Sequence, residues 1–259
     1  MMAPTLHTYD LSPRVMAFST TRVGGSPLSL CGGFNIGNAS DEHPEARHAC
    51  ITSLCESLSI DEQHLVFPHQ THGCEVRRVA DDFFTLTSHT RQMLLEGVDA
   101  LSTDLSGVCI GVNTADCVPV LLYDTVHHAA AAIHAGWRGT VQRIVQSVIR
   151  HMHEQYATQP AQLCAVIGPS ISPARFEVGD EVYQAFAEGG FPMEQIAHRQ
   201  EKWHIDLWRS NSFLLTEAGV LPENIHTSGI CTYDHVDSFF SARRETIHTG
   251  RIFTAIMLR

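Results

Sequence analysis

Two apolar runs separated by the sequence NTADCVP constrain this chain more than any other feature. The stretch CIGVNTADCVPVLLYD is too apolar for a surface loop, yet an acid, a cysteine and a proline interrupt it between Asn113 and Pro119. A third apolar run, HAAAAIHAG, follows and ends at His134 and Gly136. Short apolar runs bounded by turn residues predict buried β-strands. We therefore expect buried strands that end in chemically reactive side chains.

Strand and helix patterns are mixed along the rest of the chain. VMAFSTTR, LCAVIGPSI and RIFTAIML are typical of strands, whereas residues 41–58 and the segment DLWRSNSFLLTEAGV are typical of helices. The elements do not alternate strictly, so the pattern predicts an α/β (α+β) fold with mixed sheets rather than a doubly wound one. No linker, repeat or low-complexity tract divides the chain, and residues 1–259 are predicted to form a single domain.

The clearest predicted helix lies in GTVQRIVQSVIRHMHEQY. Its apolar residues between Val141 and Met152 recur at helical spacing and form one face. Thr140 is the predicted N-cap. HAGWRG therefore reads as a strand end, a glycine turn and a helix start, where free N–H groups favour an anion beside Arg138.

Composition excludes several classes of function. The formal net charge is −11, which argues against a nucleic-acid or anionic-membrane binder. No apolar run approaches the roughly 20 residues that span a bilayer, and the N-terminal residues do not resemble a signal peptide. The eight cysteines are then expected to be reduced thiols in a cytoplasmic protein. The sequence indicates no particular oligomeric state.

Three potential metal ligands occur where strand-like runs break or end. His72 follows a turn in HQTHG, Cys117 lies in the break of NTADCVP, and His134 ends a strand. Two imidazoles and a thiolate suit zinc, and three protein ligands leave a fourth position open, as in catalytic zinc sites. The alternative is that Cys117 is a buried thiol and both histidines are ordinary polar residues.

A metal-free site using the same residues is a second hypothesis. Cys117 would be the nucleophile, His134 its base and Asp116 the group that orients the base. Neighbouring strand residues point to opposite faces, so Asp116 and Cys117 would need a bend between them. Copper oxidation has weaker support, because a multicopper oxidase needs several His-x-His pairs and the chain has one, at His151 and His153.

Several segments of the chain together match the pattern of a known family. The matching segments are FSTTRVGG, FNIG, HQTHGCEV, GVDALSTD, NTADCVPVLLYD, IHAGWRGT, IGPSISPARFEVGDEV, DLWRSN and SFFSARRE with TGR. Together they span most of the chain. The sequence resembles the YfiH-type family, also called laccase-domain or polyphenol-oxidase-like proteins, which are understood as purine nucleoside phosphorylases.

The resemblance implies a fold, a metal and an activity. The fold would be a single layered domain with mixed sheets, similar to toxin deamidases that use Cys and His. The family's zinc ligands fall on His72, Cys117 and His134, with copper as the alternative metal. Implied reactions are phosphorolysis of adenosine, inosine, guanosine and methylthioadenosine, and hydrolytic deamination of adenosine. The implied partners are purine nucleosides and phosphate, with no nucleic acid and no membrane.

Other candidate residues follow from this chemistry. Arginine forks bind phosphate well, although each single arginine equally suits a surface ion pair. Asn35 is a candidate nucleoside ligand, and Asp116 is a candidate to orient a ligand or exchange protons. The candidates for phosphate or substrate binding are Arg22, Arg138, Arg243 and Glu177.

The chain departs from the family pattern at two places. Asp234 stands where the family often has a second cysteine after C-T, and SARR replaces S-Y-R-R. Neither change affects the three predicted ligands. Three alternatives therefore stay open: a metal-free cysteine hydrolase or amidase acting on cell-wall precursors, a copper-dependent polyphenol oxidase, and a nucleoside-binding regulator without turnover.

Overall fold

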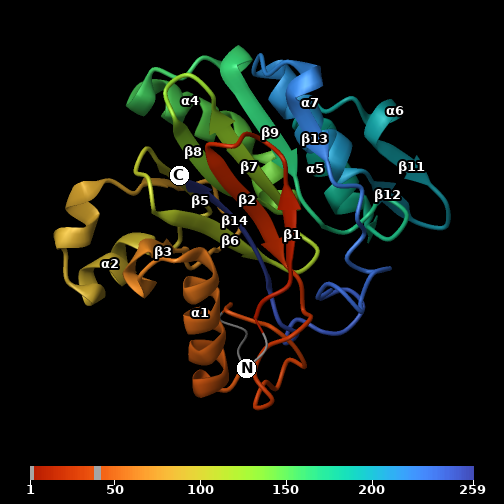
Figure 1. Cartoon of the computed structure of the whole chain (residues 1–259). Helices are drawn as coiled ribbons and strands as arrows, with labels where there is room; N and C mark the ends of the chain where they lie inside the picture. Colours follow the sequence, from red (N-terminus) through yellow and green to blue (C-terminus); the bar gives the residue numbers. More distant parts are fainter. Residues whose placement is uncertain (1–2, 38–41) are drawn as a thin grey trace.

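Two mixed sheets form the centre of the protein (Figure 1). The computed structural model describes residues 3–37 and 42–259. The first sheet has the strand order β1-β2-β14-β6-β3, in which only β3 and β6 pair in parallel. Its strands are β1 (Leu6–Tyr9), β2 (Val15–Thr20), β14 (Ile252–Leu258), β6 (Cys109–Thr114) and β3 (Leu65–Val66).

The second sheet has the order β13-β9-β7-β8-β5-β4, with parallel pairs at its two edges and antiparallel pairs between them. It consists of β13 (Ile225–Thr227), β9 (Leu163–Ile167), β7 (Val118–Asp124), β8 (Ala129–Ala135), β5 (Ala100–Thr103) and β4 (Val76–Arg78). A small antiparallel sheet contains β10 (Glu177–Val178), β12 (Trp203–Ile205) and β11 (Ala197–Arg199). The predicted α/β (α+β) class with mixed sheets is confirmed.

Helices surround the sheets. The α-helices are α1 (Pro44–Leu58), α2 (Ser88–Leu95), α3 (Trp137–Val141), α4 (Ile144–Tyr156), α5 (Asp180–Glu188), α6 (Met193–Ile196) and α7 (Leu207–Glu217). Short 3-10 helices span Glu62–His64, Asp81–Thr85, Pro160–Gln162 and Pro222–Asn224. The predicted start of the first helix at Asp41 lies outside the described residues. None of the helices in the described ranges is long and apolar enough to cross a membrane.

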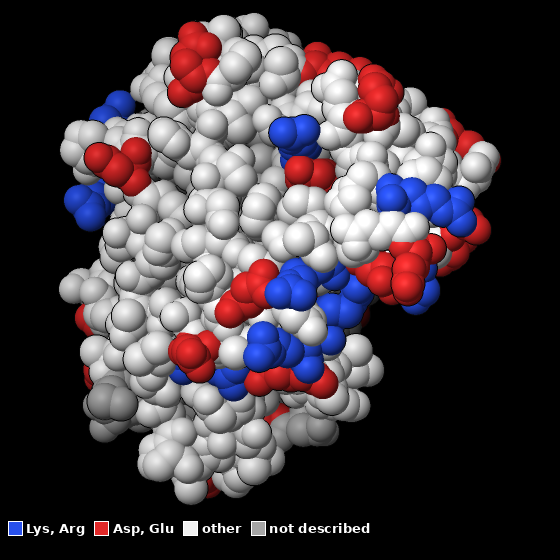
Figure 2. Space-filling view, turned by 90° about the vertical axis from the view of Figure 1, so that its right-hand side faces the viewer, with Lys and Arg blue, Asp and Glu red and all other residues white. Residues whose placement is uncertain are grey.

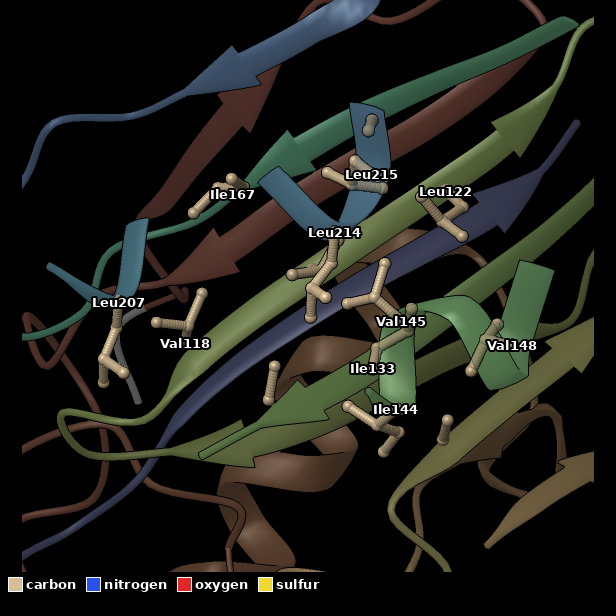
Figure 3. Packing of buried hydrophobic residues seen from close by; sticks show 14 of the residues in the cluster. Val118, Leu122, Ile133, Ile144, Val145, Val148, Ile167, Leu207, Leu214 and Leu215 are labelled. Atoms are coloured by element: carbon tan, nitrogen blue, oxygen red, sulfur yellow. The ribbon is translucent and has the colours of Figure 1, made fainter. Parts of the chain in front are cut away.

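Side chains along β7 point alternately to its two faces, so the strand belongs to two hydrophobic clusters of the core. Val118, Val120 and Leu122 face α4 and α7, where they pack with Ile133, Val145 and Leu214 (Figure 3). Leu121 and Tyr123 point the other way and pack with residues of β6 and β14 in the first sheet. Every residue of β7 is buried for this reason. The loops at the end of β7 are thereby held on a rigid base.

The prediction of a single helix after HAGWRG is wrong in one respect. It divides into α3 and α4, because Arg143 adopts a left-handed conformation with φ of 63°. The Arg143 guanidinium contacts the Glu217 carboxylate and the backbone oxygen of Gly189, which hold the break in place. Thr140 is not the N-cap. It lies inside α3, where its hydroxyl accepts a hydrogen bond from Asn211. The predicted apolar face of α4 is buried as expected.

Candidate metal and nucleoside site

Three chain segments meet at the ends of β7 and β8. The break between β6 and β7 covers residues 115–117, shorter than the predicted break, and carries Cys117. His134 lies near the end of β8, directly opposite Pro119 of β7. His72 lies in the loop between β3 and β4. Antiparallel pairing of β7 with β8 thus places the thiol beside one imidazole, and the loop brings the second.

Left-handed backbone conformations set the direction of the Asp116 and His72 side chains. Asp116 has φ of 86° and His72 has φ of 63°, both uncommon for residues other than glycine. The metal-free hypothesis required a bend here, and the left-handed Asp116 supplies it, but His134 Nδ1 is hydrogen-bonded to Asp99 and not to Asp116. The Asp116 carboxylate accepts hydrogen bonds from the Thr232 hydroxyl at 2.7 Å and the Arg243 backbone N–H at 2.6 Å.

His72, Cys117 and His134 form one cluster. One potential ligand atom from each lies within 4.8 Å of the others. The two imidazole centroids are 4.8 Å apart. His134 is buried, Cys117 is half-buried and His72 is exposed, so the cluster opens to solvent on one side. This geometry suits a metal ion with an open coordination position.

Gly136 leaves room for this cluster. A Cβ atom at this position would lie 3.1 Å from Cys117 Sγ and 3.2 Å from His72 Cδ2. Both distances are tighter than ordinary van der Waals contact. Glycine in the HAGWRG turn therefore lets α3 begin directly against the cluster.

Asp99 supports the cluster from behind, and our sequence reasoning missed it. It is fully buried just before β5. Its carboxylate accepts hydrogen bonds from His134 Nδ1 at 2.7 Å and from the backbone N–H groups of His72 at 3.0 Å and Gly73 at 2.7 Å. The signal for finding it was an acid inside the apolar segment GVDALSTD, the same kind of signal that drew attention to Asp116.

The charges of the cluster are mutually stabilising. Burial by itself raises the pKa of the Cys117 thiol, but the His134 and His72 imidazoles outweigh burial and lower that pKa to about 6. Burial lowers the pKa of His134, whereas Cys117 and Asp99 raise it to about 9. The thiol is therefore ready to ionise near neutral pH, as a metal ligand or a nucleophile must.

A pocket of about 560 Å³ opens over the cluster. This volume lies in the roughly 300–1,000 Å³ range of small-molecule sites. The apolar part of the pocket lining includes Ile171, Phe176 and Ile247. Its polar and charged part includes Asn113, Thr114, Asp116, Arg243 and Arg251. Arg251 was not among the candidates selected from the sequence. Gln70 braces this wall, since its side-chain amide bonds both the N–H and the carbonyl of Asn113 at 2.8 Å.

Two of the candidate cations do not line this pocket. The Arg22 guanidinium forms an ion pair with Glu245 at 2.9 Å. Arg138 is exposed and its guanidinium stacks over the Trp137 ring, 4.4 Å from the centroid. Of the three arginines selected from the sequence, only Arg243 lines the pocket.

Asn35 and Glu177 also lie outside the pocket lining. Asn35 is fully buried, and its side-chain oxygen accepts hydrogen bonds from the backbone N–H groups of Gly37 and Arg251, each at 3.0 Å. It therefore holds the start of β14 in place. The Glu177 carboxylate pairs with Lys202 at 2.8 Å, and only its backbone carbonyl reaches a pocket residue.

Comparison with known proteins decides the family. The family model described as multi-copper polyphenol oxidoreductase laccase matches residues 16–259. The chain belongs to this family. It is 45% identical to a purine nucleoside phosphorylase of Bacteroides thetaiotaomicron, with 93% of this chain and 90% of that protein covered. It is 44% identical to adenosine deaminase RL5 from an unknown prokaryotic organism, covering 93% of each.

Solved structures agree with this assignment. The crystal structure of Bacillus licheniformis hypothetical protein YfiH superposes with a TM-score of 0.91 at 30% identity, and covers 99% of this chain and 97% of that one. The family resemblance read from the sequence is confirmed, as is the prediction that the chain is an enzyme, because both named relatives are enzymes.

Proposed function

We propose that this laccase-family protein is a zinc-dependent purine nucleoside phosphorylase that also deaminates adenosine. Its substrates would be adenosine, inosine, guanosine and methylthioadenosine. The observation that carries the proposal is the His72–Cys117–His134 cluster at the floor of a nucleoside-sized pocket. The names of the two relatives, a purine nucleoside phosphorylase and an adenosine deaminase, support the same chemistry.

The donor set fits zinc. Two imidazoles and a thiolate would hold the ion, and a fourth position would face the pocket. The hydrogen bond from His134 Nδ1 to Asp99 leaves Nε2 of that imidazole to face the metal. A multicopper site needs further histidine clusters, and the described part of the chain contains one group of at least three His, Cys, Asp or Glu residues that could hold a metal. We therefore propose zinc rather than copper.

The pocket can hold both parts of a nucleoside. Ile171 and Phe176 provide apolar surface for a purine base, while Asn113 and Asp116 provide polar groups for a sugar. In phosphorolysis a phosphate oxygen forms a bond to the anomeric carbon, and the glycosidic C–N bond breaks. Its electron pair leaves with the base, which takes up a proton. Positively charged groups near the phosphate assist this step by balancing its charge.

Deamination uses water in place of phosphate. Water adds to the purine carbon that carries the amino group, and ammonia leaves. Zinc, when bound, supplies a Lewis acid that favours ionisation of water near neutral pH. The residues of this chain then orient the base and hold the ligands in place. Both reactions require only small-molecule partners, and we propose a cytoplasmic location in which the thiols stay reduced.

One observation favours a second candidate function. Asp99, His134 and Cys117 are linked by hydrogen bonds in the order acid, base and nucleophile. That is the arrangement of a metal-free cysteine hydrolase or amidase. His72 favours the metal site instead, because a second imidazole beside the same thiol is not part of such a triad and would supply a third metal ligand.

A chromatographic assay tests the proposal. Metal-free protein, zinc-loaded protein and copper-loaded protein are each incubated with adenosine, with and without phosphate. We expect the zinc-loaded protein to give adenine and ribose 1-phosphate only with phosphate, and inosine in either tube. Turnover by metal-free protein equal to that of the zinc-loaded protein would support the cysteine hydrolase instead. Unchanged adenosine in all tubes would remove both nucleoside reactions.

A further inference from the structure

Two guanidinium groups in the pocket wall take part in none of the ion pairs formed by the described residues. Arg243 and Arg251 both line the pocket. Within residues 3–37 and 42–259, neither guanidinium forms an ion pair with an Asp or Glu side chain. Arg22, by contrast, is neutralised by Glu245. Because arginine stays charged at physiological pH, the pocket wall carries two positive charges that form no ion pair with a described Asp or Glu side chain. Asp116 and Cys117 act on Arg251 electrostatically without such a pair.

Backbone carbonyls fix the direction of both groups without neutralising them. The Arg251 guanidinium donates to the carbonyl oxygens of Thr249, of Gly250 at 3.1 Å and of Ile247 at 2.8 Å. The Arg243 guanidinium donates through one nitrogen to the carbonyl oxygens of Arg175 at 3.3 Å and Glu177 at 3.0 Å.

Each fork therefore keeps unused donors. A guanidinium carries five N–H donors. Neither Nε–H group has an acceptor among the described residues. Two oriented cations with donors to spare are the arrangement that binds an oxyanion.

Thr114 adds a third donor at the same place. Its hydroxyl is buried, lines the pocket and has no hydrogen-bond partner in the described part of the chain. Register places Thr114 of β6 opposite Ile252 of β14, the residue directly after Arg251. A buried hydroxyl without a partner is costly, so a ligand that accepts its hydrogen bond would remove that cost.

We propose that Arg251, Arg243 and Thr114 form the subsite that binds the phosphate co-substrate, and that Arg22 and Arg138 take no part in it. The inference rests on the proposed function for the identity of the anion. A tetrahedral oxyanion offers acceptors in several directions, so donors from separate segments can bind it together. The subsite adjoins Cys117 and Asp116 in one pocket, which places phosphate beside a nucleoside bound there.

Basic residues elsewhere are arranged differently. On the face shown in Figure 2, most Lys and Arg side chains lie beside Asp and Glu side chains, and no broad basic surface forms. This distribution fits recognition of one small anion in the pocket better than recognition of a polyanion on the surface.

The test is a comparison of matched arginine variants in the full-length protein. Binding of inorganic phosphate is measured by calorimetry, and KM for phosphate and for inosine by steady-state kinetics. We expect Arg251→Gln and Arg243→Gln each to weaken phosphate binding and raise KM for phosphate by about 10- to 100-fold, with a smaller change in KM for inosine. Thr114→Val is expected to weaken phosphate binding about 3- to 10-fold. Arg22→Gln and Arg138→Gln are the controls, and both should bind phosphate as the wild type does.

A structural role is tested by the conservative variant. Arg251→Lys keeps the charge but not the fork, and we expect phosphate binding between that of wild type and Arg251→Gln. Thermal unfolding of each variant identifies loss of folding. If Arg251→Gln does not fold, Arg243→Gln and Thr114→Val still decide the assignment.

The outcomes separate the subsite from the proposed function. Phosphate binding that is lost in Arg251→Gln and Arg243→Gln, in a protein without phosphorolysis, would uphold the subsite and reject the phosphorylase. If both variants catalyse phosphorolysis with a KM for phosphate within about twofold of the wild-type value, the subsite is rejected and the phosphorylase is upheld. Loss of phosphate binding in Arg22→Gln or Arg138→Gln would also overturn the assignment.

Discussion

The Asp99 carboxylate accepts a hydrogen bond from His134 Nδ1 over 2.7 Å, from behind the His72–Cys117–His134 cluster. The same carboxylate binds three consecutive backbone N–H groups, those of Thr71, His72 and Gly73. One buried acid thus orients one potential ligand through its ring and another through its backbone. Burial raises the pKa of Asp99, but the His134 and backbone hydrogen bonds outweigh it and lower that pKa, so the group stays ionised.

Replacing Asp99 is expected to weaken metal binding without removing a ligand. Asp99→Asn loses the charge that holds His134 Nδ1 as a donor. Changes of this kind typically reduce metal affinity about 10- to 100-fold. Zinc affinity would be measured by competition with a chelating dye. Asp104→Asn is the control, because Asp104 pairs with Arg78 on the surface. Equal affinity in Asp99→Asn and wild type would contradict a positioning role.

Removing the thiol is expected to remove the metal. Cys117→Ser, purified with zinc in the buffer, should contain well under one equivalent of zinc by elemental analysis and should have lost nucleoside turnover. Cys74→Ser is the matched control, because Cys74 is half-buried outside the cluster and its thiol hydrogen-bonds to backbone oxygens of Gly139 and Gln142. A full equivalent of zinc in Cys117→Ser would rule out the thiolate as a ligand.

The close packing around Gly136 gives a third prediction about the cluster. Gly136→Ala is compatible with the backbone, since φ is −63° at this position. Its Cβ would press on Cys117 Sγ and His72 Cδ2 at 3.1–3.2 Å. We expect zinc affinity to fall several-fold while the melting temperature changes little. Unchanged affinity would show that the cluster moves apart freely.

The ionisation of Cys117 can be followed directly by alkylation. In metal-free protein the pKa of the thiol is about 6, so the rate of reaction with iodoacetamide should be close to its maximum at pH 7. Below pH 6 it should fall tenfold per pH unit, because the thiolate is the reactive form. His134→Ala should move the midpoint to higher pH, and zinc should protect the thiol. A midpoint at the ordinary cysteine pKa would contradict the assigned electrostatics.

Packing between α7 and the second sheet gives a prediction for stability. Leu214 is fully buried against α4 and the strands (Figure 3). Leu214→Ala should lower the free energy of unfolding by about 2–5 kcal/mol, from lost burial and the cavity left behind. Urea denaturation measures this change. Leu221→Ala is the control, because Leu221 is exposed and should change stability by less than about 0.5 kcal/mol.

Much of the architecture and the cluster follows from local sequence. Apolar runs bounded by glycine, proline and polar residues predicted β7, β8 and β9, because a buried strand must be apolar and must end where backbone groups reach other partners. The same rule located Cys117 and His134 at strand ends. It also placed His72 beside a turn, the family resemblance then supported all three residues, and the structure brings them together.

Tertiary contacts decided the rest. The break between α3 and α4 depends on Arg143 reaching Glu217 and Gly189, residues that are distant in the sequence. Asp99 can support the cluster only because β5 pairs with β8 and brings the carboxylate to His134. Among the arginines, pattern alone could not separate Arg22, which meets Glu245, from Arg251, which meets carbonyls in the pocket wall. Local sequence determines where reactive side chains stand on each element, whereas their partners and charge balance depend on segments that only the folded chain brings together.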